Sequence, residues 1–122
     1  LGAEVVVFTT SEGKGQDALQ LGASEVVVST DAAAMAAQAG RLDFILNTVA
    51  VPHDLDAFVA LLKRDGTMTL VGIPLAPHLP QPVLNLIYRR RSVSGSSRKR
   101  CISFATASAA ESATVCMRAC WL

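Results

Sequence analysis

Apolar runs of strand length alternate with helix-like segments along most of this chain. Such runs occupy residues 5–8, 25–28, 42–46 and 67–71, and a short further strand is predicted at 92–94. Continuous β-branched runs are typical of strands buried on both faces of a parallel sheet. The segments between them predict helices over 14–21, 31–39, 53–64 and 83–90. We therefore expect an α/β fold with a doubly wound parallel sheet.

The third predicted helix has a clear amphipathic pattern. Its apolar positions share one face, and they are Leu55, Phe58, Leu61 and Leu62. The basic residues 63–64 would end this helix, and the pair Asp65-Gly66 predicts a turn before the next strand. At the other boundaries, Gly22 is a natural left-handed residue after a helix, and Thr30 or Asp31 would cap the second helix.

The loop after the first predicted strand contains the residues that most clearly suggest ligand binding. Thr9, Thr10 and Ser11 follow the valine run, and Lys14 stands at the start of a predicted helix. Hydroxyl groups, a helix N-terminus and one lysine together suit a phosphate group. In a doubly wound domain the second strand ends beside the adenosine ribose, where an acidic residue would favour NAD. Residues 5–11 contain no Asp or Glu, so the loop favours NADP. The alternative is a plain helix cap by Thr10 or Ser11 with a solvated lysine.

The composition describes one globular domain at most. The chain has 122 residues, of which 51% are hydrophobic and 17% charged. It contains no apolar run long enough to span a bilayer, and its first residues do not have the pattern of a signal peptide. We therefore expect a cytoplasmic protein without a membrane partner. The net charge of +1 predicts no nucleic-acid partner.

The last segment differs from the rest of the chain in its charge and its composition. Up to Ser97 there are seven Lys and Arg against nine Asp and Glu, whereas afterwards there are four against Glu111 alone. All three cysteines also lie in this tail, which shows no clear strand alternation. We therefore predict two parts, residues 1–97 and a divergent tail at 98–122, and we interpret the tail as the product of a reading-frame shift. A genuine basic extension is the alternative, with residues 89–91 and 98–100 forming an anion-binding patch.

The order of several motifs resembles a known family. The stretches "FTTSEGK", "LGASEVV", "DFILNTV", "LLKRDGTMTLVGIP" and "SVSGS" are similar to the cofactor-binding domain of zinc-dependent medium-chain alcohol dehydrogenases. Within that family the chain looks closest to the NADP(H)-dependent aldehyde reductases that resemble cinnamyl alcohol dehydrogenase. The resemblance covers about four-fifths of the chain and implies a Rossmann-type domain of an oxidoreductase.

The resemblance also implies a role for individual residues. Those that would hold the 2′-phosphate of NADP are Thr9, Thr10, Ser11 and Lys14. Those beside the ribose and nicotinamide would be Asn47, Thr48 and Val49, then Gly72, Ile73 and Pro74, and finally Gly95 and Ser96. Residues 47–48 could instead be a strand-to-loop cap, and the glycines could be plain turn residues.

Two parts of the family pattern are absent from this sequence. The glycine-rich pyrophosphate loop does not occur, and the first strand before it is missing as well. The zinc ligands of the family have no counterpart, because the cysteines are fifteen and four residues apart and His53 and His78 match no ligand. We therefore expect a partial Rossmann-type sheet, with no metal ligand and no catalytic residue in this chain.

A missing first strand has a physical consequence. In the order 3-2-1-4-5-6 that strand lies between the second and fourth, so its absence would leave two unpaired interior edges. We expect the isolated chain to be marginally stable or insoluble, and inactive alone. In a longer relative the reaction would be hydride transfer between NADPH and an aldehyde, with zinc as Lewis acid.

Other functions remain open at this level. The chain could be a non-catalytic nucleotide-binding module, or an interaction protein with a basic tail. The resemblance allows a homodimer, because the family's last strand often pairs across a dimer. The partners it implies are the cofactor and an aldehyde or alcohol.

Overall fold

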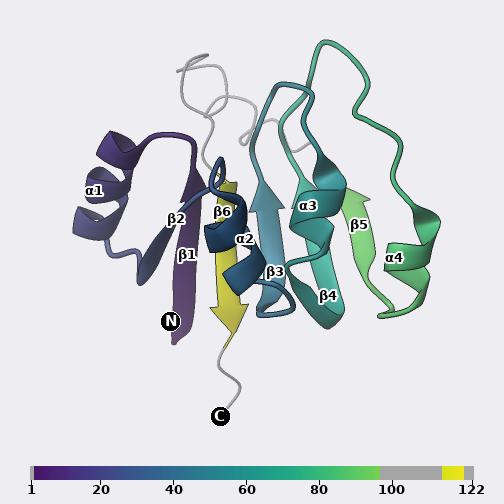
Figure 1. The fold of residues 1–122 in the computed structure, drawn as a ribbon, viewed down its shortest axis with the longest axis horizontal. Coiled ribbons are helices and arrows are strands. Elements are labelled where there is room, and N and C mark those ends of the chain that lie inside the picture. Colours follow the sequence, from purple (N-terminus) through teal and green to yellow (C-terminus); the bar gives the residue numbers. More distant parts are fainter. Residues whose placement is uncertain (1, 97–113, 120–122) are drawn as a thin grey trace.

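The computed structural model describes residues 2–96 and 114–119, which form a six-stranded sheet with helices beside it (Figure 1). The strands are β1 (Ala3–Thr9), β2 (Glu25–Val28), β3 (Leu42–Asn47), β4 (Leu62–Leu70), β5 (Ser92–Gly95) and β6 (Thr114–Ala119). The helices are α1 (Glu12–Gln20), α2 (Ala32–Ala37), α3 (Leu55–Val59) and α4 (Val83–Ile87). The strand order across the sheet is β2-β1-β6-β3-β4-β5.

Five of these strands confirm the predicted α/β class. β1 pairs in parallel with β2, and β4 pairs in parallel with both β3 and β5. Each pair is joined by a helical crossover, as a doubly wound sheet requires. The carboxyl ends of β1, β3, β4 and β5 therefore lie at one edge of the sheet, the upper edge in Figure 1.

The sixth strand corrects two expectations. Residues 114–119 of the predicted divergent tail form β6, although the tail shows no alternating pattern. β6 runs antiparallel to both neighbours. Its residue Cys116 lies opposite Val6 of β1 and opposite Ile45 of β3. It occupies the place between β1 and β3 that was expected to stay empty, so the predicted unpaired interior edges are wrong. The structure thereby removes the reason for expecting an insoluble chain.

The third helix is shorter than its pattern predicts. α3 ends at Val59, and Leu62 already begins β4. The predicted apolar face is nevertheless buried, because Leu61 and Leu62 are 2% and 0% exposed. Burial in the core decides the backbone conformation here, rather than helical spacing. The expected turn at Asp65 appears as a bulge in β4, where Asp65 has φ of 63° and the register with β3 shifts.

The core lies between the sheet and the helices that cover one face. α2 and α3 cover the face toward the viewer in Figure 1. Phe8 of β1 meets Phe58 of α3 edge to face, with ring centroids 5.9 Å apart. The buried apolar residues are Val6, Phe8, Val27, Leu42, Ile45, Leu55, Phe58, Val59, Leu61, Leu62 and Met68. Across the described part of the chain, the helices are all too short or too polar to cross a membrane.

Side-chain capping decides where α2 begins. Of the two predicted caps, the structure uses Asp31, whose Oδ1 accepts from the backbone N–H groups of Ala33 at 2.9 Å and Ala34 at 3.2 Å. α2 has only six residues, so its end groups are a large share of its hydrogen bonds. At α1, Gly22 follows the C-cap with φ of 99°, which confirms its predicted left-handed conformation.

Removing the Asp31 cap should destabilise the fold measurably. We expect Asp31→Ala to lower the free energy of unfolding by about 1 kcal/mol, the usual cost of losing a capping side chain. Urea unfolding followed by circular dichroism would measure it. Asp17→Ala is the matched control, because Asp17 is exposed within α1 and caps no helix. Equal losses in both variants would contradict the capping role.

Candidate functional site

The predicted cofactor residues gather at the upper edge of the sheet in two groups. The first group follows β1, and the second follows β3, β4 and β5. β6 lies between β1 and β3 and separates the groups by the width of one strand. Both groups therefore lie at the carboxyl ends of the parallel strands, which is where α/β sheets bind ligands.

Thr9 closes β1 and is only 2% exposed. Its Oγ1 accepts a hydrogen bond from the backbone N–H of Ser11 at 3.2 Å and donates to the Ser11 carbonyl oxygen at 3.3 Å. Its own carbonyl oxygen accepts from the backbone N–H of Ser29 at 2.8 Å. The Thr9 hydroxyl is thus used inside the fold, where it shapes the loop and joins the ends of β1 and β2.

Thr10 and Ser11 present their side chains to solvent. Ser11 is the N-cap residue of α1, with extended φ and ψ of −132° and 128°, but its hydroxyl makes no capping hydrogen bond. The predicted cap position is therefore right, while the capping bond itself is absent. Lys14 lies half-buried in the first turn of α1, and Glu12 lies there too. Exposed hydroxyls at a helix N-terminus suit an anion, and the Glu12 carboxylate works against one.

Asn47 ends β3 and is 1% exposed. Its Oδ1 accepts from the backbone N–H of Val49 at 3.1 Å, and its Nδ2 lies 2.8 Å from Nε2 of His53. Its carbonyl oxygen accepts from the backbone N–H of Val71 at 2.9 Å. The Asn47 side chain therefore organises the strand-end loop, as in the predicted cap interpretation, and leaves Thr48 and Val49 half-buried beside it.

Gly72 brings the loops after β3 and β4 into contact. A Cβ atom built on Gly72 would lie 2.3 Å from the Val49 carbonyl oxygen and 2.8 Å from that of Thr48. These are backbone atoms, so a side chain at this position requires the loop itself to move. The structure thus brings together three predicted residues: Thr48, Val49 and Gly72.

The remaining predicted residues are more open. Ile73 is 65% exposed, and Pro74 beside it is half-buried. Gly95 pairs with Leu70 at the end of β5, and the backbone N–H of Ser96 donates to the Leu70 carbonyl oxygen at 2.9 Å. No atom lies within 4 Å of a Cβ built on Gly95, so this glycine is not required by packing.

His53 and His78 are site residues that the sequence did not reveal as such. Both lie in loops, since α3 begins only at Leu55 and not at His53 as the pattern predicts, and their rings meet edge to face with centroids 4.9 Å apart. The His53 backbone N–H points to Nδ1 of His78 at 3.4 Å, across 25 positions of sequence. A contact over this separation leaves no local sequence signal. The two histidines connect the loop after β3 to the loop after β4.

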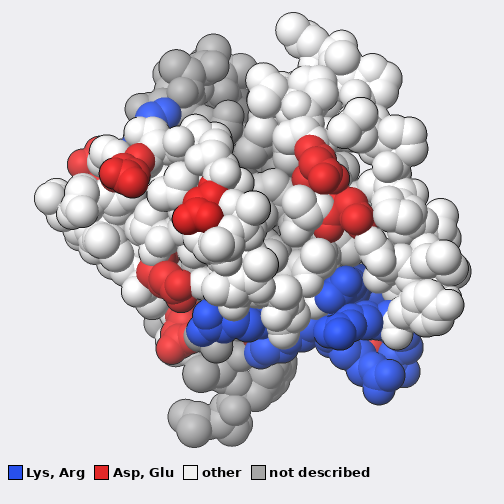
Figure 2. Space-filling model, viewed as in Figure 1, with Lys and Arg blue, Asp and Glu red and all other residues white. Residues whose placement is uncertain are grey.

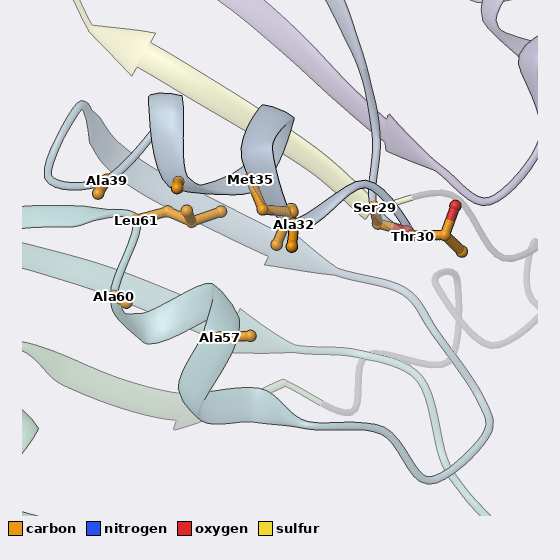
Figure 3. Close-up of a pocket in the computed structure, with 9 residues that line it drawn as sticks. Ser29, Thr30, Ala32, Met35, Ala39, Ala57, Ala60 and Leu61 are labelled. Atoms are coloured by element: carbon orange, nitrogen blue, oxygen red, sulfur yellow. The ribbon is translucent and has the colours of Figure 1, made fainter.

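A shallow groove of about 370 Å³ runs between α2 and α3 (Figure 3). Small side chains from both helices form its walls, and the lining residues are Ser29, Thr30, Ala32, Met35, Ala36, Ala39, Ala57, Ala60 and Leu61. None of these residues carries a titratable group, so the groove has no acid–base chemistry of its own.

Basic residues gather at the opposite edge of the sheet, along the lower edge in Figure 2. Arg90 forms an ion pair with Asp65 at 2.7 Å, and this hydrogen-bonded contact lowers the pKa of the Asp65 carboxyl. Arg91 donates to the carbonyl oxygens of Ala60 and Leu62, and burial lowers the pKa of its guanidinium. Two of the three arginines at 89–91 therefore support the fold, and the other members of the proposed patch, at 98–100, lie outside the described residues.

The described residues offer no metal centre. Within 2–96 and 114–119 no three side chains of His, Cys, Asp or Glu lie close enough together to hold an ion. The two neighbouring histidines have no third ligand beside them, and a zinc site needs at least three protein ligands. The zinc of the resembling family therefore does not fit these residues.

The parallel sheet, its helical crossovers and the loops at its carboxyl edge define an α/β domain of the Rossmann type. A family model described as "Zinc-binding dehydrogenase" matches residues 1–113. The chain therefore belongs to the zinc-binding dehydrogenase family, and the resemblance found in the sequence is confirmed.

Individual relatives agree with this membership. The chain is 60% identical to "Aldehyde reductase YahK" of Escherichia coli (strain K12) over 96 residues, which are 79% of this chain and 28% of that protein. A solved cinnamyl alcohol dehydrogenase from Sorghum bicolor superimposes with a TM-score of 0.71 at 38% identity, covering 83% of this chain and 30% of the other. A cinnamyl alcohol dehydrogenase from Helicobacter pylori, complexed with NADP(H), gives a TM-score of 0.64 at 31% identity, over 84% and 30% of the two chains. The chain thus spans less than a third of the length of these relatives.

Proposed function

We propose that this chain is the part of an NADP(H)-dependent aldehyde reductase that holds the adenosine 2′-phosphate and lines the nicotinamide side of the cofactor. The observation that carries the proposal is the loop after β1. It ends in exposed Thr10 and Ser11 at the N-terminus of α1, and the Ser11 hydroxyl has no capping partner. Residues 5–11 contain no carboxylate that would repel a phosphate.

The named relatives support the same cofactor. One solved structure at 31% identity is complexed with NADP(H), and a 40% identical relative from Mycolicibacterium smegmatis is named an NADP-dependent alcohol dehydrogenase. When bound, the cofactor supplies the hydride. This chain's own residues would bind its phosphate at Ser11, orient its ribose beside the loop after β3, and approach its nicotinamide ring with the backbone at Gly72.

A charge placed at Ser11 tests this assignment. We expect Ser11→Asp to weaken NADPH binding about 10- to 100-fold, because a carboxylate replaces a donor and faces the phosphate. NADH binding should be unchanged or improved, since the carboxylate can accept from a ribose 2′-hydroxyl. Calorimetric titration of both cofactors against the chain would measure the ratio.

Ser24→Asp is the matched control for this experiment. It adds the same charge to an exposed serine, but at the amino end of β2 and away from the loop after β1. It should leave the ratio of NADPH to NADH affinity unchanged. The 2′-phosphate assignment would be withdrawn if Ser11→Asp behaved like this control.

A further inference from the structure

His53 lies in the loop after β3 and makes hydrogen bonds both within this loop and to the loop after β4. Its ring Nδ1 is 2.8 Å from the Val51 carbonyl oxygen, and its Nε2 is 2.8 Å from Asn47 Nδ2. Its backbone N–H is directed at Nδ1 of His78, which belongs to the loop after β4. One residue thus makes hydrogen bonds toward the end of β3, within its own loop and to the neighbouring loop.

The partners of the ring assign its proton. A carbonyl oxygen can only accept, so Nδ1 must carry the hydrogen that meets Val51. In a neutral ring Nε2 is then an acceptor, and it faces the amide NH₂ of Asn47. That amide orientation is itself required, because Asn47 Oδ1 accepts from the Val49 N–H. Every donor in this chain of bonds meets an acceptor only when His53 is neutral and protonated on Nδ1.

The ring is also fixed by packing. It meets Phe58 edge to face at 5.7 Å, and Phe58 is a core residue in contact with Phe8. It also meets the His78 ring edge to face. The core therefore sets the position of His53, and His53 sets the positions of the loops that Gly72 brings into contact.

We propose that His53 is a positioning residue of the cofactor site. In its neutral form with the proton on Nδ1, it holds the loop 47–51 against the loop 72–78, so that backbone groups beside the nicotinamide keep one arrangement. This proposal rests on the proposed function for the identity of the ligand. The holding of the loops is a separate statement, and it can be tested without any cofactor.

Nuclear magnetic resonance of the ring nitrogens tests the proposal in the unaltered chain. The chain has only two histidines, so His78→Phe assigns both sets of signals. We expect His53 to show the Nδ1–H tautomer, which is the minor form of free neutral histidine. The Nε2–H tautomer at His53 would overturn the proposal.

Two substitutions separate the hydrogen bonds from the packing. His53→Phe keeps an aromatic ring against Phe58 but removes both ring hydrogen bonds. We expect amide exchange at Val49 to become about tenfold faster, and NADPH to bind about fivefold more weakly. His53→Gln supplies an oxygen that can accept from Asn47, and it should recover part of both losses.

The outcomes distinguish the two proposals. If His53→Phe speeds exchange at Val49 no more than elsewhere in the chain, His53 does not hold this loop and the inference fails. If the unaltered chain binds no NADPH, the proposed function fails, while the tautomer and the exchange rates still decide the role of His53. If exchange changes as expected but NADPH affinity does not, His53 holds the loops without positioning the cofactor, and the inference fails in that part.

Discussion

A chain that stops at Ser97 is expected to lose its cooperative fold. Without residues 114–119, β1 keeps only β2 as a neighbour and β3 keeps only β4, so the edges along residues 3–8 and 44–46 that face β6 lose their partner. Two interior edges would then expose unpaired backbone groups. Because folded domains are stable by only about 5–15 kcal/mol, losing a central strand that pairs on both sides should exceed the available margin. Size-exclusion chromatography should show aggregates, and thermal denaturation should show no cooperative transition.

The matched control for this truncation is a chain that ends at Ala119. It keeps all of β6 and removes only the last residues of the tail. We expect it to remain free of aggregates and to unfold cooperatively, like the 122-residue chain. A monomeric, cooperatively unfolding chain of residues 1–97 would show that β6 does not complete the sheet.

A single methyl group at Gly72 should disturb both stability and binding. In Gly72→Ala the new Cβ would lie 2.3 Å from the Val49 carbonyl oxygen, so the loop after β3 must move away. Overpacking of this kind costs about 1–3 kcal/mol of unfolding free energy. The moved loop contains the backbone that we place beside the nicotinamide. Urea unfolding and an NADPH titration of the same protein should therefore both report a loss.

Gly95→Ala provides the comparison for this prediction. Gly95 also ends a parallel strand at the upper edge of the sheet, but no atom lies within 4 Å of its added Cβ. We expect it to change the unfolding free energy by less than about 0.5 kcal/mol, as surface substitutions usually do. Equal effects of the two alanines would mean that the close approach at Gly72 does not hold the loops.

The strands of the parallel sheet could be predicted because their apolar runs agree with their burial. Val6, Val27 and Met68 all lie in predicted strands and in the core. The start of β4 could not, because Leu61 and Leu62 satisfy a helical stripe and a buried strand equally well. Only the packing of Leu62 beside Leu42 of β3 decides between the two.

β6 could not be predicted from its own residues. Its conformation depends on two open edges, at β1 and β3, which are far from it in the sequence. A strand that is paired on both sides can tolerate weak local propensity, since its neighbours supply the hydrogen bonds. The origin of the tail remains a prediction, which resequencing the encoding DNA would test.

The edge that holds the candidate site followed directly from the strand assignment, because parallel strands end together. The strand assignment did not show what each side chain at this edge contacts. Thr9 and Asn47 are predicted to lie beside the cofactor, and in the structure their side chains also bond to the backbone of Ser11 and Val49. Whether a polar group faces a ligand or its own backbone depends on loop geometry, which short motifs do not encode. The hydrogen bond between Asn47 and His53 likewise depends on loop geometry, so short motifs do not predict it.

The position of β6 also constrains how this protein can be made. The strand that joins the two halves of the sheet comes late in the given sequence, and it pairs Ala119 with Ala3, 116 positions earlier. Contacts at such long sequence separation slow folding, because the connecting loop must be closed before they form. During synthesis the β1–β2 and β3–β5 units therefore keep open edges until residues 114–119 have been made. A chaperone that shields strand edges would act in this interval, and the yield of folded protein should depend on it.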